Sequence, residues 1–176
     1  MTGITVRPSG RSLGADIEGV DLSQPLDDAT FGQILDAWAE HLVLHFRGQK
    51  LTDDQLAEFS ARFGALDDAP IPAAGTPQHD RRRDIAVISN IVEGDKPLGS
   101  LGNSELVWHQ DMSYKDLPPK ASILYGVETP ATGGNTEFYN LYKAYETLSD
   151  DLKQRIQGLK IKHDATRNSA GQARVG

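Results

Sequence analysis

The sequence predicts an α+β protein with an antiparallel sheet, in which helices dominate the first half of the chain and β-strands the second. In the first half, apolar residues recur in steps of three and four behind residues that cap helices. In the second half, apolar and polar residues alternate over short runs that Gly and Pro interrupt. A chain of 176 residues has the size of one domain with a sizeable core. We therefore expect a single domain over residues 1–176.

The first half predicts short strands around a helix. Residues 4–7 and 13–17 have the composition of strands, and Pro8-Ser9-Gly10 forms the turn between them. Asp27-Asp28 can cap a helix. Its apolar positions follow one helical face, which we expect to be buried: Phe31, Ile34, Leu35, Trp38 and Leu42. Residues 43–46 then read as a short buried strand.

A second helix is predicted after Leu51. Thr52 and Gln55 form a capping box, in which each side chain can satisfy a backbone N–H of the other residue. Leu56, Phe59 and Phe63 are expected on the buried face of this helix, and Gly64 ends it. A long irregular connection, rich in proline and small residues, is expected from residue 67 to 83.

The second half is predicted to be mainly β-structure. Residues 121–127 are predicted to form a strand with two distinct faces, one of them made of Ala121, Ile123, Tyr125 and Val127. Gly133-Gly134-Asn135 supplies a tight turn after it. Asn140 and Ser149 are predicted to cap two short helices. The other strands are expected over residues 85–88, 136–139 and 159–163.

Charge and composition exclude several classes of protein. A net charge of −7 argues against a protein that binds nucleic acid, which normally presents a basic face. The absence of cysteine rules out disulfides and thiolate metal sites and is consistent with a reducing compartment. The sequence shows neither the apolar core of a signal peptide nor a membrane-spanning run. We therefore expect a cytoplasmic protein that binds neither nucleic acid nor membrane.

His109 and Asp111 are the candidate metal ligands. In an extended strand, side chains two residues apart lie on the same face, so these two could present an imidazole nitrogen and a carboxylate oxygen to one point. This is two thirds of a 2-His-1-carboxylate triad, which binds non-haem iron(II) and leaves coordination positions open. The spacing alone also fits an ordinary pair of residues at the end of a strand. By contrast, His45 lies in an apolar run, and a hydrogen-bonded structural role is expected for it rather than a metal site shared with His41.

Several blocks of the sequence carry a family resemblance. In the first half they are Leu13-Gly14-Ala15-Asp16-Ile17, Phe46-Arg47-Gly48-Gln49 and Phe63-Gly64. In the second half they are Trp108-His109-Gln110-Asp111-Met112-Ser113-Tyr114, Pro118-Pro119, Gly133-Gly134-Asn135-Thr136 and Ala144-Tyr145-Glu146-Thr147-Leu148-Ser149. In order and spacing, these blocks resemble the taurine dioxygenase (TauD/TfdA) family of iron(II)- and 2-oxoglutarate-dependent oxygenases.

The resemblance implies a fold, a reaction and a set of site residues. The implied fold is a double-stranded β-helix, or jelly roll, with a helical N-terminal portion, incomplete here at its C-terminal end. His109 and Asp111 would bind Fe(II), and Thr136 would contact the carboxylate of the co-substrate 2-oxoglutarate. With dioxygen, such an enzyme oxidises a small organic substrate, typically by hydroxylation, and releases succinate and carbon dioxide.

The family's distal metal histidine and its 2-oxoglutarate-binding arginine are expected further downstream than this sequence extends. His163 follows Asp111 too closely to match the distal histidine, and Arg167 is no better match for the arginine. An alternative is therefore a catalytically silent jelly-roll fragment that acts as a binding or assembly module. Unpaired strand edges in such a fragment favour pairing with another chain, as in a homo-oligomer. The sequence does not select a substrate.

Overall fold

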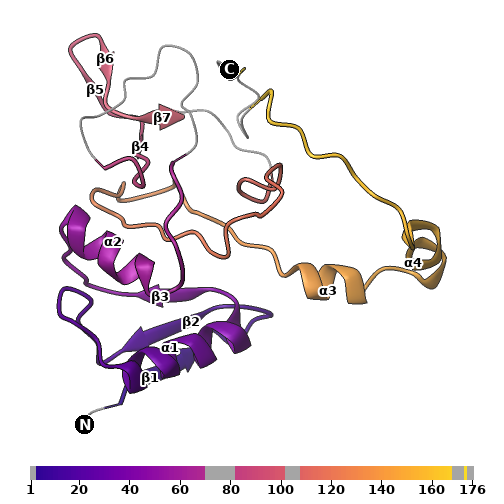
Figure 1. The fold of residues 1–176 in the computed structure, drawn as a ribbon, viewed down its shortest axis with the longest axis horizontal. Coiled ribbons are helices and arrows are strands. Elements are labelled where there is room, and N and C mark those ends of the chain that lie inside the picture. The colour runs from indigo at the N-terminus through magenta and orange to yellow at the C-terminus, as the bar shows by residue number, and fades with distance from the viewer. Residues whose placement is uncertain (1–2, 70–81, 102–107, 168–172, 174–176) are drawn as a thin grey trace. The chain divides into compact units, whose positions relative to one another are not determined.

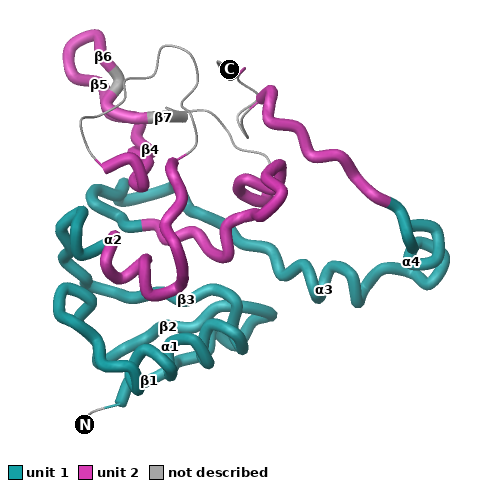
Figure 2. The backbone as a smooth tube through the Cα atoms, viewed as in Figure 1, with its two compact units in different colours: residues 1–56, 125–159 teal, residues 57–124, 160–176 magenta. Residues whose placement is uncertain are grey.

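The computed structural model describes residues 3–69, 82–101, 108–167 and 173. The chain divides into two compact units (Figure 2). The first unit comprises residues 1–56 and 125–159, and the second comprises residues 57–124 and 160–176. Each unit mixes short strands with helical or irregular segments. None of the helices in the described ranges is both long enough and apolar enough to span a membrane.

A three-stranded sheet forms the base of the first unit, with the strand order β1-β2-β3 (Figure 1). Strand β1 (Thr5–Pro8) is antiparallel to β2 (Ala15–Glu18), which is parallel to β3 (Leu44–Phe46). The three predicted strands are confirmed to within two residues. The predicted antiparallel pairing is found between β1 and β2 but not between β2 and β3, because a helix between these two carries the chain back to start β3 in the same direction as β2.

That helix, α1 (Asp28–His41), packs against β2 and β3 and supplies much of the core of the first unit. The carboxylate of Asp27 caps it by accepting a hydrogen bond of 2.8 Å from the backbone N–H of Thr30. Phe31, Ile34 and Ala37 are buried on one helical face, and Ile34 is fully enclosed. The predicted apolar stripe is therefore confirmed at Phe31 and Ile34, while its other members are half-buried.

Helix α2 (Asp53–Ala61) begins at the predicted capping box. The backbone N–H of Thr52 donates to Gln55 Oε1 at 2.8 Å, and the backbone N–H of Gln55 donates to Thr52 Oγ1 at 3.2 Å. Phe59 is buried and meets Phe63 edge-to-face, with ring centroids 5.4 Å apart. The start signal is thus as predicted, but α2 ends at Ala61 instead of Gly64, and Leu56 and Phe63 are only half-buried.

Short ladders characterise the described part of the second unit. Strands β4 (Ile88–Ser89) and β7 (Ser100–Leu101) pair in parallel, and β5 (Val92–Glu93) pairs antiparallel with β6 (Lys96–Pro97). The predicted strand over 85–88 is reduced to β4. Most of the predicted connection from 67 to 83 lies outside the described residues.

Helices α3 (Leu141–Glu146) and α4 (Asp150–Ile156) are capped as predicted. Asn140 Oδ1 accepts from the backbone N–H of Lys143 at 3.0 Å, and Ser149 Oγ accepts from that of Leu152 at 3.3 Å. Neither helix has a buried residue. Their start sites therefore follow from local capping alone.

The strands predicted over residues 121–127, 136–139 and 159–163 are not formed. In the described parts of the chain, the backbone of these segments forms no β-ladder with another segment, and nearly all of their side chains are exposed. An alternating pattern becomes a strand only when a neighbouring strand takes up its backbone hydrogen bonds and its apolar face is covered. The architecture is a mixture of helices and short strands, and the jelly roll stays a prediction.

Candidate metal centre

His109 and Asp111 lie at the start of a turn in the second unit. Residues 109–110 have no regular structure, residues 111–114 form the turn, and the backbone N–H of Lys115 donates to the carbonyl of Met112 at 3.0 Å. Met112 has a φ of 48°, a left-handed conformation that is uncommon for residues other than glycine. The expected extended strand at this position is wrong, because the left-handed residue reverses the chain directly after Asp111.

The two side chains nevertheless converge. His109 Nε2 lies 3.1 Å from Asp111 Oδ1, and the side chains are 37% and 58% exposed. The separation fits a hydrogen bond from the imidazole N–H to the carboxylate. It also fits two adjacent ligands of a six-coordinate metal ion, because donors about 2.1 Å from the metal and at right angles to each other are about 3.0 Å apart. The donor set, one imidazole nitrogen and one carboxylate oxygen, therefore suits two positions of an iron(II) site.

Ser122 holds the second oxygen of the same carboxylate. Its hydroxyl donates to Asp111 Oδ2 at 3.0 Å, so the two oxygens of Asp111 have different partners. This contact was not predicted, because Ser122 stood in a predicted strand on the face that it shares with Leu124 and Gly126. The contact depends on how the chain turns between residues 111 and 122, and no local pattern encodes that path.

A third metal ligand does not join this pair in the described ranges. No group of three or more His, Asp or Glu side chains that could hold a metal ion occurs among the residues that the structure describes. His163, the late histidine of the sequence, lies in the same unit, where its Nδ1 is 2.8 Å from Ser113 Oγ. Its proximity to the turn comes through Ser113 and adds no ligand to His109 and Asp111.

Thr136 is exposed in an irregular segment of the first unit. It follows Gly133, Gly134 and Asn135, and both glycines have positive φ angles. His109 and Asp111 belong to the second unit. The structure thus brings two of the three predicted site residues together, while the role of Thr136 stays a prediction.

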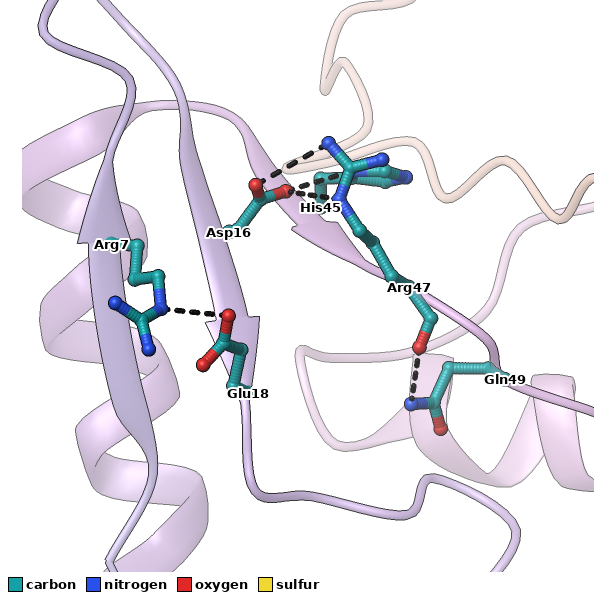
Figure 3. A network of polar contacts seen from close by, with 6 residues as sticks. All are labelled: Arg7, Asp16, Glu18, His45, Arg47 and Gln49. Carbon is teal, nitrogen blue, oxygen red and sulfur yellow. Dashed lines mark hydrogen bonds and ion pairs between the residues drawn. The ribbon is translucent and has the colours of Figure 1, made fainter.

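A second polar cluster lies on the sheet of the first unit (Figure 3). Asp16 Oδ1 accepts from His45 Nδ1 at 2.9 Å and lies 3.2 Å from Arg47 Nε, while Asp16 Oδ2 accepts from Arg47 Nη2 at 3.3 Å. The hydrogen bonds from His45 and Arg47 lower the pKa of Asp16 from its ordinary value. Next to this group, Arg7 Nε donates to Glu18 Oε1 at 2.7 Å.

All of these residues except Glu18 line an open hollow of about 270 Å³. Both arginines that face the hollow are matched by carboxylates, so the cluster is a set of ion pairs across the sheet rather than a cationic binding site. The expectation that His45 is a hydrogen-bonded structural histidine is confirmed.

The family model and the curated relatives that match this chain point to one family. The family model described as "Taurine catabolism dioxygenase TauD, TfdA family" matches residues 5–174. Pentalenolactone F synthase of Streptomyces avermitilis is 36% identical over 160 residues, which are 89% of this chain and 51% of that protein. The alpha-ketoglutarate-dependent 2,4-dichlorophenoxyacetate dioxygenase of Cupriavidus pinatubonensis is 30% identical over 170 residues, which are 92% of this chain and 58% of that protein.

Solved structures agree with these matches. The crystal structure of AAD-2 in complex with Mn(II) and N-oxalylglycine superimposes with a TM-score of 0.69 at 28% identity. The match covers 89% of this chain and 56% of AAD-2. The chain therefore spans about half the length of the curated relatives and the solved structure that it matches.

Proposed function

Because the chain belongs to the taurine catabolism dioxygenase TauD, TfdA family, we propose that it is part of an Fe(II)- and 2-oxoglutarate-dependent dioxygenase. The protein hydroxylates a small organic substrate. When bound, the iron and 2-oxoglutarate supply the oxidation of that substrate by dioxygen, with release of succinate and carbon dioxide. The observation that carries the proposal is the 3.1 Å approach of His109 Nε2 to Asp111 Oδ1 in a chain of this family.

His109 and Asp111 are assigned as two of the iron ligands. To hold the metal, the imidazole would present Nε2 without a hydrogen and the carboxylate would be ionised, so the neutral ring would carry its hydrogen on Nδ1 instead of sharing it with Asp111. Both side chains are partly exposed, which gives the metal a path to them from solvent.

Thr136 is assigned to the carboxylate of 2-oxoglutarate. Its hydroxyl can donate a hydrogen bond to an anionic oxygen, and such charge-assisted bonds are stronger than bonds between neutral groups. The position follows a turn of two glycines and is exposed, as a residue that meets a diffusing co-substrate must be.

We further propose that the two units are parts of one dioxygenase domain with a jelly-roll core. The third iron ligand and the arginine that pairs with 2-oxoglutarate belong to the portion of the family domain that the chain does not span. The matches to about half of each relative support this division. Exposed apolar side chains in the second half of the chain also support it, since exposed apolar surface is normally covered by further structure: Leu117, Leu124, Val127, Phe138, Leu159 and Ile161.

The substrate is proposed to be a small organic acid, a sulfonate or a ring-bearing carboxylate. One relative is named for 2,4-dichlorophenoxyacetate, which combines an aromatic ring with a carboxylate. The test is a screen of such compounds with the full-length protein, iron(II) and 2-oxoglutarate, in which succinate release is measured. A compound that raises succinate release above the substrate-free rate identifies the substrate class.

The metal assignment has its own experiment. Anaerobic addition of iron(II) and 2-oxoglutarate to the full-length protein should give a weak visible charge-transfer band, and His109→Ala should abolish it. His163→Ala is the matched control, because His163 is a histidine of the same unit that bonds to Ser113 instead of Asp111. A band that persists unchanged in His109→Ala would show that the iron is held elsewhere.

A second candidate function is a binding or assembly module without catalysis. One observation favours it: the described residues supply two ligands and no third. The same anaerobic experiment separates the candidates, because a silent module gives no band at stoichiometric iron(II). Sedimentation at several protein concentrations then tests whether the exposed apolar residues pair two copies of the chain.

A further inference from the structure

We propose that Ser122 is a positioning residue that fixes which oxygen of Asp111 is offered to the metal. This inference rests on the proposed function. Ser122 Oγ donates to Asp111 Oδ2 at 3.0 Å, while Asp111 Oδ1 lies 3.1 Å from His109 Nε2. The carboxylate is therefore held from both sides, with one oxygen engaged by a hydroxyl and the other turned toward the imidazole nitrogen.

The chemistry of a carboxylate makes this division matter. An unrestrained aspartate can bind a metal ion through one oxygen or through both. In a site with three protein ligands, a chelating co-substrate takes two more positions, and dioxygen needs the one that is left. A bidentate Asp111 would take that last position. A hydrogen bond to Oδ2 disfavours the bidentate form, because it occupies a lone pair that the metal would need.

The local backbone supports this role for Ser122. Asp111 directly precedes Met112, whose carbonyl accepts the hydrogen bond from Lys115 N–H that closes a turn, so the backbone next to the ligand is held on one side. The side chain of Asp111 is 58% exposed, and without Ser122 water would hydrate Oδ2 and let the carboxylate rotate. The serine supplies a donor from a segment eleven residues further along the chain.

The role belongs to the hydroxyl and not to the bulk of the side chain. Ser122→Ala removes one oxygen atom and the donor, whereas Ser122→Thr keeps the donor. Ser113→Ala is the matched control, since it removes the hydroxyl that lies 2.8 Å from His163 Nδ1 in the same unit. All three changes are at exposed or half-buried positions, so the fold should survive them.

The experiment measures Mn(II) binding to the full-length protein without substrate, by titration calorimetry. Loss of a partner that orients a metal ligand typically weakens metal binding by about 10–100-fold, so we expect a loss of at least tenfold in Ser122→Ala. Ser122→Thr and Ser113→Ala should bind within about threefold of the unaltered protein. Water-proton relaxation should also report fewer waters on the Mn(II) of Ser122→Ala, because a bidentate Asp111 displaces one. A merely structural role for Ser122 would not change that number.

The outcomes separate this inference from the function on which it rests. If the unaltered protein and His109→Ala bind Mn(II) equally, the metal assignment fails and this inference fails with it. If His109→Ala loses the metal but Ser122→Ala binds within threefold of the unaltered protein and with the same number of waters, Ser122 has no positioning role and the metal assignment stands. Equal losses in Ser122→Ala and Ser122→Thr would also overturn the inference, because the hydroxyl would then not be the cause.

Discussion

The segment from Thr5 to Phe46 and the segment from Trp108 to Ser122 use their side chains in opposite ways. The first forms a sheet and a helix that enclose Ala15, Ile17 and Ile34. The second has no helix or strand, and its exposed side chains His109 and Ser122 both contact the carboxylate of Asp111. Stability and chemistry are thus assigned to different stretches of the chain, and substitutions in the two stretches should have separable effects.

The largest effect on stability is expected at the centre of the first segment. Ile34→Ala removes a fully buried side chain between α1 and the sheet and should lower the free energy of unfolding by about 3 kcal/mol. Ile161→Ala, at a position that is 80% exposed, should change it by less than about 0.5 kcal/mol. Urea unfolding followed by circular dichroism measures both. Equal losses in the two variants would break the comparison.

A smaller effect is expected at the start of α1. Asp27 accepts hydrogen bonds from both the backbone N–H and the hydroxyl of Thr30, so Asp27→Ala should cost about 1 kcal/mol of unfolding free energy. Asp27→Asn keeps an acceptor and should recover most of it. Ser149→Ala removes the equivalent cap of α4, a helix with no buried residue, and should leave the urea midpoint unchanged. A large shift in Ser149→Ala would mean that α4 stabilises the fold after all.

Because Asp16 is ion-paired on the sheet, we expect its contribution to the free energy of unfolding to change with pH only in acid. His45 and Arg47 lower the pKa of Asp16 in the folded protein, so its contribution to stability is fully present above the ordinary pKa of an aspartate. The contribution is lost as the pH falls through the lowered pKa. The difference in urea midpoint between the unaltered protein and Asp16→Asn should therefore be largest near neutral pH and shrink in acid. His45→Gln should reproduce part of this behaviour, and a difference that grows in acid would contradict the assignment.

The smallest effect on stability is expected at the candidate metal ligands. His109→Ala removes a partly exposed pair with Asp111, and such pairs contribute little to folding. Its urea midpoint without metal should match that of the unaltered protein, although iron binding is lost. Added Mn(II) should raise the midpoint of the unaltered protein only, since a ligand stabilises the state that binds it. A His109→Ala protein that unfolds early without metal would place His109 in the core of the fold instead.

Features set by a few neighbouring residues were predictable from the sequence. Three helix caps accept a hydrogen bond from a backbone N–H three residues further along the chain: Asp27, Asn140 and Ser149. The fourth, Thr52, exchanges two hydrogen bonds with Gln55. Such contacts lie within one helical turn, so the pattern of residues contains them in full. The convergence of His109 and Asp111 was also predicted, although a turn brings it about instead of a strand.

Features that need a distant partner were not predictable in the same way. The alternation over 121–127 says which side chains share a face but does not supply the strand that must pair with them. The parallel pairing of β2 with β3 depends on how α1 packs, and the contact from Ser122 to Asp111 depends on the path between them. In each case the deciding interaction joins segments whose separation no local pattern fixes.

The left-handed backbone of Met112 has a consequence for protein engineering. A residue with a β-carbon pays roughly 1–2 kcal/mol to adopt this conformation, so glycine at position 112 would relieve strain. It would also give the chain next to Asp111 more conformations to choose from. We therefore expect Met112→Gly to raise the stability of the protein and to lower its affinity for the metal ion. Selection for thermal stability alone would favour this substitution.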